Sequence, residues 1–470
     1  MRKTIKIDPV TRIEGHARVF INLGDDGRLE SAGLVVNELR GFEKILIGME
    51  ADRMPHITAR ICGVCPTAHH LAASKALDHA CGVTPPPAAV LLRELMYMGH
   101  IIHSHALSLF VLQGPDLVMG LDADAAVRNV VGVVQANPEL ARMALGIRTI
   151  GQKINELVGG RGTHPVTSVA GGISFTLDQE KKGILGRWIG EAGQMLEKIT
   201  PAVKGLLMKM LELHPAMAAD WLLPSWALGT VWDGRISLTS GKLRAIDEKG
   251  ATRAEFETGD YHRHLSEAVV DWSYMKKVAL KIDGLHDYRV GPMARINVAQ
   301  RYGTELADAE VAQFVKLGGS PCHSTVMQSY ARLIELIWAI ERAGEILEDP
   351  AIFGETRVPV RFCGSRGVGH VEAPRGTLIH DYQIDEKGIV REANLIVATQ
   401  QNYSLINHSI EQAARSHVID RPDDGALLNA VEFAIRCYDP CLSCATHAVG
   451  RMPMQLVVTR GGAAVRTIGR

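Results

Sequence analysis

Apolar and polar residues alternate with a period of two in several short segments of this chain. Residues 16–36, HARVFINLGDDGRLESAGLVV, alternate on both sides of a DDG turn and predict a β-hairpin. Residues 4–8 predict a preceding strand, and residues 235–258 predict a strand pair around the turn DEKG. Residues 368–400 predict strand, turn and strand. The sequence therefore predicts several small β regions, far apart along the chain.

Apolar residues recur at helical spacing over the longer stretches between these strands. The predicted helices cover residues 41–51, 88–112, 139–158, 178–213, 305–348, 404–418 and 424–437. We expect Pro201 to interrupt the fourth of them, because proline removes a backbone donor from a helix. The glycine-rich segment 159–172 lacks the lysine and hydroxyl residue that end a phosphate-binding loop, so it predicts a plain loop.

Together these patterns predict a mainly α protein with small β excursions, an α+β fold. The expected architecture is a large helical-bundle body with N-terminal and C-terminal β-hairpins. Neither an internal repeat nor a flexible linker is visible in the sequence. Residues 1–447 are therefore expected to form a single domain, with residues 235–258 as a β insert.

Composition narrows the classes of function. The chain has 470 residues, of which 46% are hydrophobic, and this is enough for a large buried core. Its formal net charge of −1 gives no basic surplus for binding nucleic acid. The sequence has no run of about 18 apolar residues, so it predicts no transmembrane helix. The N-terminal MRKTIKIDPV lacks the apolar region of a signal peptide. We therefore expect a cytoplasmic protein.

Two CxxC pairs lie near opposite ends of the chain. Cys62 and Cys65 stand in ARICGVCPTAHH, and Cys441 and Cys444 stand in YDPCLSCATH. A CxxC pair places two sulfurs where they bind one metal, and thiolates suit zinc, iron and nickel. The sequence thus predicts that the chain ends meet at a buried metal site. The other cysteines lack such spacing and are expected to be buried thiols: Cys81, Cys322, Cys363 and Cys437.

A structural zinc site is the commonest meaning of two CxxC pairs. Such sites usually staple small local modules, whereas these pairs are far apart in a chain with ample core. Histidines also follow both pairs, His69 after Cys65 and His447 after Cys444. They are placed to donate hydrogen bonds to thiolates and tune a metal, which favours a catalytic site. Arg60 is expected to be either a donor near the first pair or a structural ion-pair partner.

Both cysteine segments resemble those of the large, catalytic subunit of nickel–iron hydrogenases. Three further segments match the same family in the expected order: VTRIEGHARV at residues 10–19, NELRGFE at residues 37–43 and VEAPRGTLIH at residues 371–380. The resemblance therefore covers nearly the whole chain. It implies reversible cleavage of dihydrogen into protons and electrons.

A nickel–iron centre is the cofactor that this resemblance implies. Cys62 and Cys441 correspond to the terminal nickel thiolates, and Cys65 and Cys444 to the thiolates that bridge nickel and iron. The family's iron also carries cyanide and carbonyl ligands. By the same resemblance, the hydroxyl of Thr399 hydrogen-bonds an iron cyanide.

The resemblance also assigns roles to charged residues. Glu14 corresponds to a proton-relay acid; taken alone, it would be a surface carboxylate. Arg375, otherwise a surface arginine, corresponds to a guanidinium over the open side of the metals, with Pro374 beside it and Asp439 as the partner that fixes it. The family often has an acid at the position of Ser104, so the anchoring of Arg375 differs here.

A magnesium-like ion is implied below the active site. Glu43, His447 and the carbonyl of Leu378 correspond to its ligands; without the resemblance, Glu43 would be a charge at a helix N-terminus. In this family an endopeptidase removes the tail that follows the last histidine. Residues 448–470 are therefore expected to be a C-terminal extension removed on maturation, and the alternative is a terminal strand, QLVVTR, that stays.

The chain has no cysteine pattern for an iron–sulfur cluster of its own. Electrons must therefore leave through a partner, which the family supplies as a small iron–sulfur subunit. Among the soluble groups, the motifs resemble viologen-reducing, heterodisulfide-reductase-linked enzymes, with NAD-linked, flavin-linked and deazaflavin-linked relatives left open. Two rival functions are a non-catalytic zinc scaffold and the quinone-site subunit of complex I, which has lost the nickel thiolates.

Overall fold

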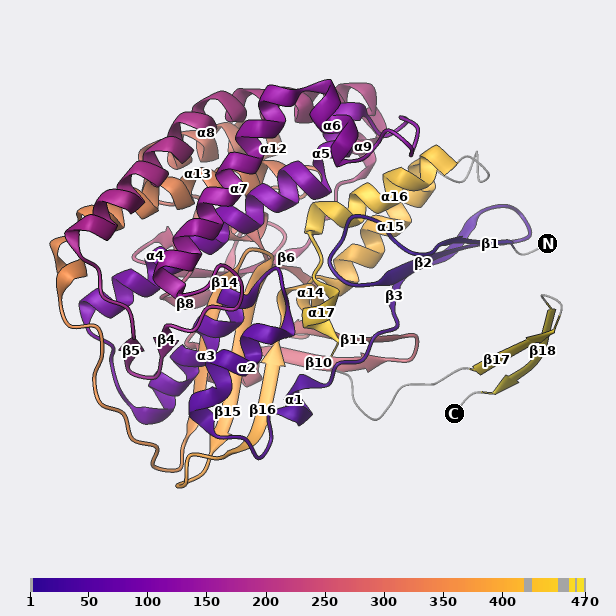
Figure 1. Ribbon diagram of the computed structural model, residues 1–470. Helices are drawn as coiled ribbons and strands as arrows, with labels where there is room; N and C mark the ends of the chain where they lie inside the picture. Colours follow the sequence, from indigo (N-terminus) through magenta and orange to yellow (C-terminus); the bar gives the residue numbers. More distant parts are fainter. Residues whose placement is uncertain (1–2, 418–424, 447–455, 461–462, 469–470) are drawn as a thin grey trace.

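A bundle of long helices forms one half of the molecule. The computed structural model describes residues 3–417, 425–446, 456–460 and 463–468. Four helices pack against one another in the upper half of Figure 1: α4 (Pro87–Ala106), α7 (Pro138–Gly159), α8 (Gln179–Leu213) and α13 (Met327–Glu348). The predicted mainly α body is therefore confirmed.

Local sequence explains where these helices begin. Pro138 opens α7, and the side chain of Asn137 accepts a hydrogen bond from the Leu140 amide. The predicted interruption of α8 at Pro201 is wrong, because the helix continues through it. Ile199 and Val203 on either side are buried, so packing against α7 and α13 maintains the helix across the proline.

The predicted helix at residues 305–348 is two helices. They are α12 (Glu305–Gly318) and α13, separated by the segment 319–326. The predicted helix at residues 41–51 is mostly wrong, since α1 covers only Phe42–Ile45. The remaining helices are α2 (Met54–Thr58), α3 (Pro66–Cys81), α5 (Gly114–Met119), α6 (Val130–Ala136), α9 (Pro215–Asp220), α10 (Tyr261–His264), α11 (Pro292–Ala299), α14 (Ala398–Gln401), α15 (Tyr403–His417), α16 (Gly425–Tyr438) and α17 (Leu442–Ala445).

Small antiparallel sheets form the other half. The predicted N-terminal hairpin is confirmed and is joined by the first strand, and residues 368–400 hold three strands where two were predicted. These strands are β1 (Lys3–Ile7), β2 (Ala17–Leu23), β3 (Leu29–Val36), β14 (Arg366–Ala373), β15 (Gly376–Ile384) and β16 (Val390–Ile396). Inward positions of β2 alternate with exposed or half-buried ones, as the sequence pattern requires.

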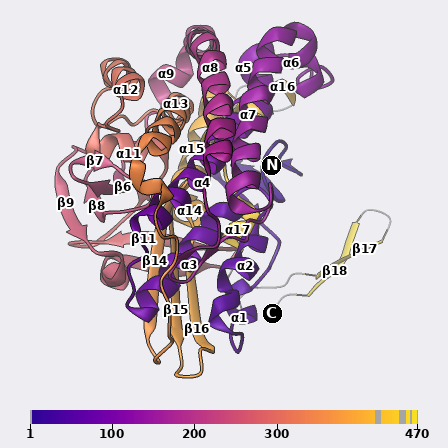
Figure 2. The same cartoon turned by 60° about the vertical axis from the view of Figure 1, so that its left-hand side comes forward.

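The β insert is larger than predicted. The strand pair around DEKG belongs to a five-stranded sheet, which Figure 2 shows at the left of the molecule beside α11, and a three-stranded sheet follows it. Its strands are β6 (Trp226–Trp232), β7 (Arg235–Ile236), β8 (Lys242–Ile246), β9 (Thr252–Phe256), β10 (Leu265–Val270), β11 (Ser273–Lys281), β12 (Leu285–His286) and β13 (Tyr288–Arg289). Two short pairs complete the strands: β4 (Ser168–Val169) with β5 (Gly172–Ile173), and β17 (Leu456–Arg460) with β18 (Ala463–Ile468).

Helix α3 lies directly on β14, and this contact places the first cysteine pair. Gly367 and Gly369 of β14 make the close approach possible. A Cβ on Gly367 would lie 2.1 Å from the Ala76 carbonyl oxygen, and one on Gly369 would lie 2.4 Å from the Ala76 amide nitrogen. Cys65 is the N-cap of α3, so the sheet fixes the cysteine through the helix.

The segments around Glu14 and Cys441, which are near opposite ends of the sequence, meet beside α3. Glu14 forms a parallel β-bridge with Cys441, and the Leu442 amide donates to the Glu14 carbonyl at 3.1 Å. This bridge joins the N-terminal segment to the second cysteine segment. The segment Pro87–Leu112 is long and apolar enough to cross a membrane, but 72% of its apolar window is buried inside the protein, as in a core helix.

Candidate metal centre

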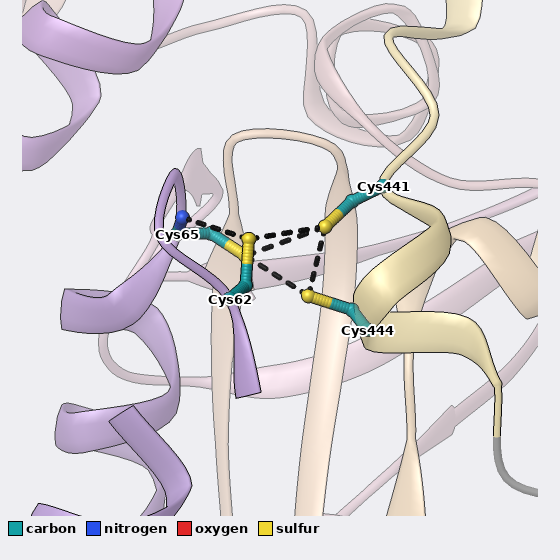
Figure 3. Close-up of side chains that lie close together, drawn as sticks. All are labelled: Cys62, Cys65, Cys441 and Cys444. Atoms are coloured by element: carbon teal, nitrogen blue, oxygen red, sulfur yellow. Dashed lines mark hydrogen bonds between the residues drawn. The ribbon is translucent and has the colours of Figure 1, made fainter. Parts of the chain in front are cut away.

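Four cysteine sulfurs converge between α3 and α17, as Figure 3 shows. All four side chains are buried, and their sulfurs lie within 4.8 Å of one another. Cys62 Sγ is 3.3 Å from Cys441 Sγ, and Cys65 Sγ is 3.1 Å from Cys444 Sγ. Each of these contacts joins the first pair to the second. The sulfurs therefore form one cluster, which could hold a metal.

Backbone amides support the sulfur of Cys62. The amides of Val64 and Cys65 donate to it at 3.2 Å and 3.3 Å. The other three thiols lower the pKa of Cys62 through hydrogen bonds, whereas burial raises the pKa of Cys441 and of Cys444. A bound cation would favour the ionised form of these thiols. This donor set fits a thiolate-ligated metal.

His69 contacts the second pair, as expected from its place after Cys65. Its Nε2 lies 3.3 Å from Cys444 Sγ, and its Nδ1 lies 3.0 Å from His380 Nε2. His380 Nδ1 in turn lies 2.6 Å from the hydroxyl of Tyr382. Sequence reasoning missed His380 and Tyr382, which lie on β15. A buried chain of hydrogen bonds thus orients the imidazole against the sulfur.

Glu14 reaches the cluster from the N-terminal segment. Its Oε2 accepts a hydrogen bond from Cys441 Sγ at 3.0 Å and from the Ser443 amide at 3.0 Å. Burial raises the pKa of Glu14, and the negative charge of Cys62 adds to this. A carboxyl group with a raised pKa, in direct contact with a candidate metal ligand, is suited to accept and release protons.

Arg375 is held by Asp439. Its Nε donates to the Asp439 carbonyl at 2.6 Å, and its Nη2 donates to Oδ1 at 3.1 Å. Both side chains are buried, and Asp439 adopts a left-handed backbone with φ of 52°. Burial lowers the pKa of Arg375, but the charges of Asp439 and of the cysteine sulfurs outweigh burial and raise it above its ordinary value.

Comparison with known proteins identifies this arrangement. A family profile described as nickel-dependent hydrogenase matches residues 40–138 and 246–447, and one described as HoxL-like matches residues 4–39. The chain belongs to the nickel-dependent hydrogenase family. The vhu F420-non-reducing hydrogenase of Methanococcus voltae has a subunit that is 42% identical over 413 residues, which cover 87% of this chain and 98% of that protein.

Other relatives support the same assignment. The NAD-reducing hydrogenase HoxS subunit beta of Cupriavidus necator is 38% identical over 488 residues, which cover 100% of this chain and 99% of that protein. The crystal structure of an NAD+-reducing NiFe hydrogenase in the H2-reduced state matches with a TM-score of 0.91 and 38% identity, over 95% of this chain and 99% of that one. The chain is a nickel–iron hydrogenase subunit, and neither the zinc scaffold nor the complex I subunit is favoured.

Within this hydrogenase, Ser104 does not take over the role of an acid. Ser104 Oγ, Arg375 Nη1 and Asp439 Oδ2 are among the buried polar atoms of the described residues that have no hydrogen-bond partner. Arg332, which sequence reasoning missed, places its Nε 3.9 Å from Asp439 Oδ2, and its Nη1 donates to the Cys437 carbonyl at 3.1 Å. Asp439 is thus the carboxylate that serves both arginines.

The remaining predicted residues near the cysteines have structural contacts. Thr399 Oγ1 accepts a hydrogen bond from the Cys441 amide at 2.9 Å, so it positions the second pair. Pro374 is buried in the turn between β14 and β15, next to Arg375. Leu378 is buried in β15 opposite Val371. His447 lies outside the described residues.

Glu43 does not have the surroundings of a magnesium ligand. Lys276 Nζ lies 3.5 Å and 3.4 Å from its two carboxylate oxygens. Burial lowers the pKa of Lys276, but the charges of Glu267 and Glu43 outweigh burial and raise it. An ammonium about 4 Å from a divalent ion would offset roughly 8 kcal/mol of the attraction that the carboxylates exert on that ion, at an effective dielectric constant near 20. Glu43 therefore already has a cationic partner, which does not match a site built for a divalent ion, and the implied ligand His447 lies outside the described residues.

Two predictions for other residues are corrected. Arg60 is exposed and donates to the His56 carbonyl, so it neither contacts the cysteines nor forms a structural ion pair among the described residues. Of the other cysteines, Cys322 and Cys437 are buried as expected, but Cys81 is partly exposed and Cys363 is exposed. Cys363 lies in an irregular segment before β14, where it is out of phase with the alternating, partly buried Val358, Val360 and Phe362.

Proposed function

We propose which residues of this nickel–iron hydrogenase chain carry the steps of dihydrogen cleavage into two protons and two electrons. The observation that supports the proposal is the contact between the Glu14 carboxylate and the sulfur of Cys441, at the edge of the four-cysteine cluster. Cys62 and Cys441 would bind nickel, and Cys65 and Cys444 would bridge nickel and iron. When bound, the nickel–iron group supplies the redox-active site at which the bond between the hydrogen atoms is split.

Glu14 acts as the proton acceptor in this proposal. Heterolytic cleavage releases a proton at the centre, and a base must receive it within hydrogen-bond reach. The 3.0 Å distance from Glu14 Oε2 to Cys441 Sγ meets this requirement. The raised pKa of Glu14 lets the carboxyl group hold the proton and then pass it on. In the reverse direction, the same group delivers protons.

Arg375 provides a fixed positive charge beside the cluster. Asp439 holds two of its nitrogens, and Nη1 has no hydrogen-bond partner within the described part of the chain. A guanidinium stays protonated, so it can polarise dihydrogen without titrating. Asp439 and Pro374 position this group, and His69 fixes the orientation of the Cys444 sulfur.

The iron is proposed to carry cyanide and carbonyl ligands, as in the family. Thr399 accepts from the Cys441 amide, which leaves its hydroxyl proton available to donate to such a ligand. The four thiolates complete the donor set that soft metals prefer.

Electrons are proposed to leave through a small iron–sulfur subunit in the cytoplasm. Relatives are named as individual subunits of hydrogenases, which supports an assembly of several different chains. The physiological acceptor is proposed to be linked to heterodisulfide reductase, as the resemblance of the motifs implies, and relatives named F420-non-reducing hydrogenases favour an acceptor other than F420. An NAD-linked or flavin-linked partner is the second candidate, because an NAD-reducing hydrogenase is also a relative.

A maturation endopeptidase is proposed to cleave after His447, which leaves residues 1–447 as one hydrogenase domain and removes residues 448–470. Intact mass of the active enzyme tests this step. A chain ending at His447 supports cleavage, and an active chain that retains Arg470 refutes it.

Elemental analysis of the purified complex, combined with dihydrogen-dependent dye reduction, tests the function. We expect one nickel per large subunit, iron in addition to that of the partner clusters, and viologen reduction under dihydrogen. Zinc alone, without dye reduction, would refute the assignment.

A further inference from the structure

A lysine side chain lies between two carboxylates, one on α1 and one on β10. Lys276 on β11 places its Nζ within 3.5 Å of both oxygens of Glu43, on α1, and 3.3 Å from Oε1 of Glu267, on β10. All three side chains are largely buried, with exposed fractions of 17%, 13% and 22% for Lys276, Glu43 and Glu267. An ammonium with two carboxylate neighbours resembles a bound cation in its surroundings.

Backbone and amide donors complete the contacts of these carboxylates. The Leu395 amide donates to Glu43 Oε1 at 3.0 Å, and Asn394 Nδ2 donates to Glu267 Oε2 at 2.9 Å. Every oxygen of Glu43 and of Glu267 therefore has a donor from the chain itself. The ammonium therefore competes with a metal ion for the charge and lone pairs of Glu43, which Mg²⁺ would need as an oxygen ligand at about 2.1 Å.

We propose that Lys276 is a built-in cation that takes the place of a divalent metal ion at Glu43. The two carboxylates and one ammonium leave a single net negative charge, which needs no further cation of charge two. Strand β11 supplies this charge from the insert, so the cation is covalently part of the chain. A metal that must be acquired, and that can be lost to chelators, is thereby replaced.

Location gives this cation a structural role near the second cysteine pair. Glu43 lies on α1, and the amides of Arg40 and Gly41 just before it donate to the Thr446 carbonyl at 3.2 Å and 3.3 Å. Thr446 is two residues beyond Cys444 in the same segment. Lys276 therefore ties the insert to the element that holds the end of this segment.

The metal content of the mature complex tests the proposal directly. The complex is equilibrated with 1 mM MgCl2, desalted rapidly, and analysed for magnesium and nickel. We expect fewer than 0.1 magnesium ions per nickel and no change of thermal midpoint between buffers with EDTA and with MgCl2. About one magnesium per nickel would overturn the proposal, whereas the nickel content and dye reduction of the same sample report on the hydrogenase function separately.

A pair of neighbouring lysines supplies a matched variant and control. Lys276→Ala frees both carboxylates, and we expect it to bind one Mn²⁺ per chain, seen as a six-line signal in electron paramagnetic resonance, and to gain thermal stability with MgCl2. Lys277→Ala removes an equivalent charge that pairs with Asp287 at 2.9 Å, and it should bind no Mn²⁺. Equal Mn²⁺ binding by the two variants contradicts the proposal; if Lys276→Ala does not assemble, the magnesium content of the wild-type complex decides.

Discussion

Replacing Glu14 by glutamine tests the proposed proton path. The change removes the titratable oxygen but keeps the length of the side chain and a carbonyl oxygen. That oxygen can still accept the hydrogen bond that the Ser443 amide donates to Glu14 at 3.0 Å in the wild-type chain. The backbone bridge between Glu14 and Cys441 is also unaffected, because it uses main-chain atoms. The variant should therefore fold and bind metal as the wild type does.

Magnitude follows from the contact of Glu14 with the Cys441 sulfur. A positioned general base contributes about 10²- to 10⁴-fold to a rate. At about 1.4 kcal/mol per factor of ten, its loss raises the barrier by roughly 3–5.5 kcal/mol. A fall in viologen reduction of about 10²- to 10⁴-fold is therefore expected for Glu14→Gln. Exchange of deuterium gas with water protons should fall in parallel, because exchange requires the proton to leave the site.

Nickel content is measured on the same preparation, so that lost assembly is not mistaken for lost proton transfer. Glu38→Gln is the matched control, since Glu38 is partly exposed and pairs with His16. It should keep full activity. Glu14→Gln protein with full nickel and an exchange rate within about threefold of wild type would refute the proposed role of Glu14.

Three further predictions concern buried charged or titratable side chains. Asp439→Asn weakens the charged contact to Arg375, which is worth about 1.5–3 kcal/mol. Dihydrogen oxidation should therefore fall about 10- to 100-fold at unchanged nickel content. An unchanged kcat would argue against the anchoring of Arg375 by Asp439. Glu335→Gln breaks the fully buried pair with Arg295, 2.5 Å apart, and should lower the free energy of unfolding by about 3–5 kcal/mol, measured by denaturation; a change below 1 kcal/mol contradicts it. Burial lowers the pKa of His70 to about 3. The contribution of the neutral imidazole to the free energy of unfolding is therefore present above about pH 6.5 and is lost as the pH falls toward 3. His70→Gln should flatten this pH dependence of the thermal midpoint, and an unchanged slope refutes the prediction.

Cysteine spacing and ordered motifs made the metal site predictable from sequence. Each CxxC pair carries its meaning locally, because two sulfurs three residues apart converge whatever the rest of the chain does. His69 and Glu14 could equally be picked out from the sequence, since His69 stands in the same short segment as the first cysteine pair and Glu14 in a matching motif. The long helices were predictable for a similar reason: their apolar residues repeat over three or more turns, as in α7 and α13.

Contacts of single residues outside the matched segments were not predictable. Arg332 lies on a long helix and Lys276 on a strand, and neither position has a neighbouring residue that signals a partner. Their roles arise only when the fold brings them to Asp439 and to Glu43. The strands of the insert outside the predicted pair were missed because most are two to seven residues long and pair across the chain, as β13 does with β6. Such pairing depends on tertiary packing more than on local pattern.

The contacts around the second cysteine pair explain why the four thiols suit a redox-active metal better than a structural one. Structural zinc stabilises modules that lack a sufficient core. This chain has a continuous buried apolar core, which includes the cysteines themselves. Cys441 is also held without a metal, because Thr399 accepts from its amide, Glu14 bridges its backbone, and Arg375 binds the preceding Asp439. Since these contacts already define the geometry, the thiolates are available to donate charge to a metal that changes its oxidation state.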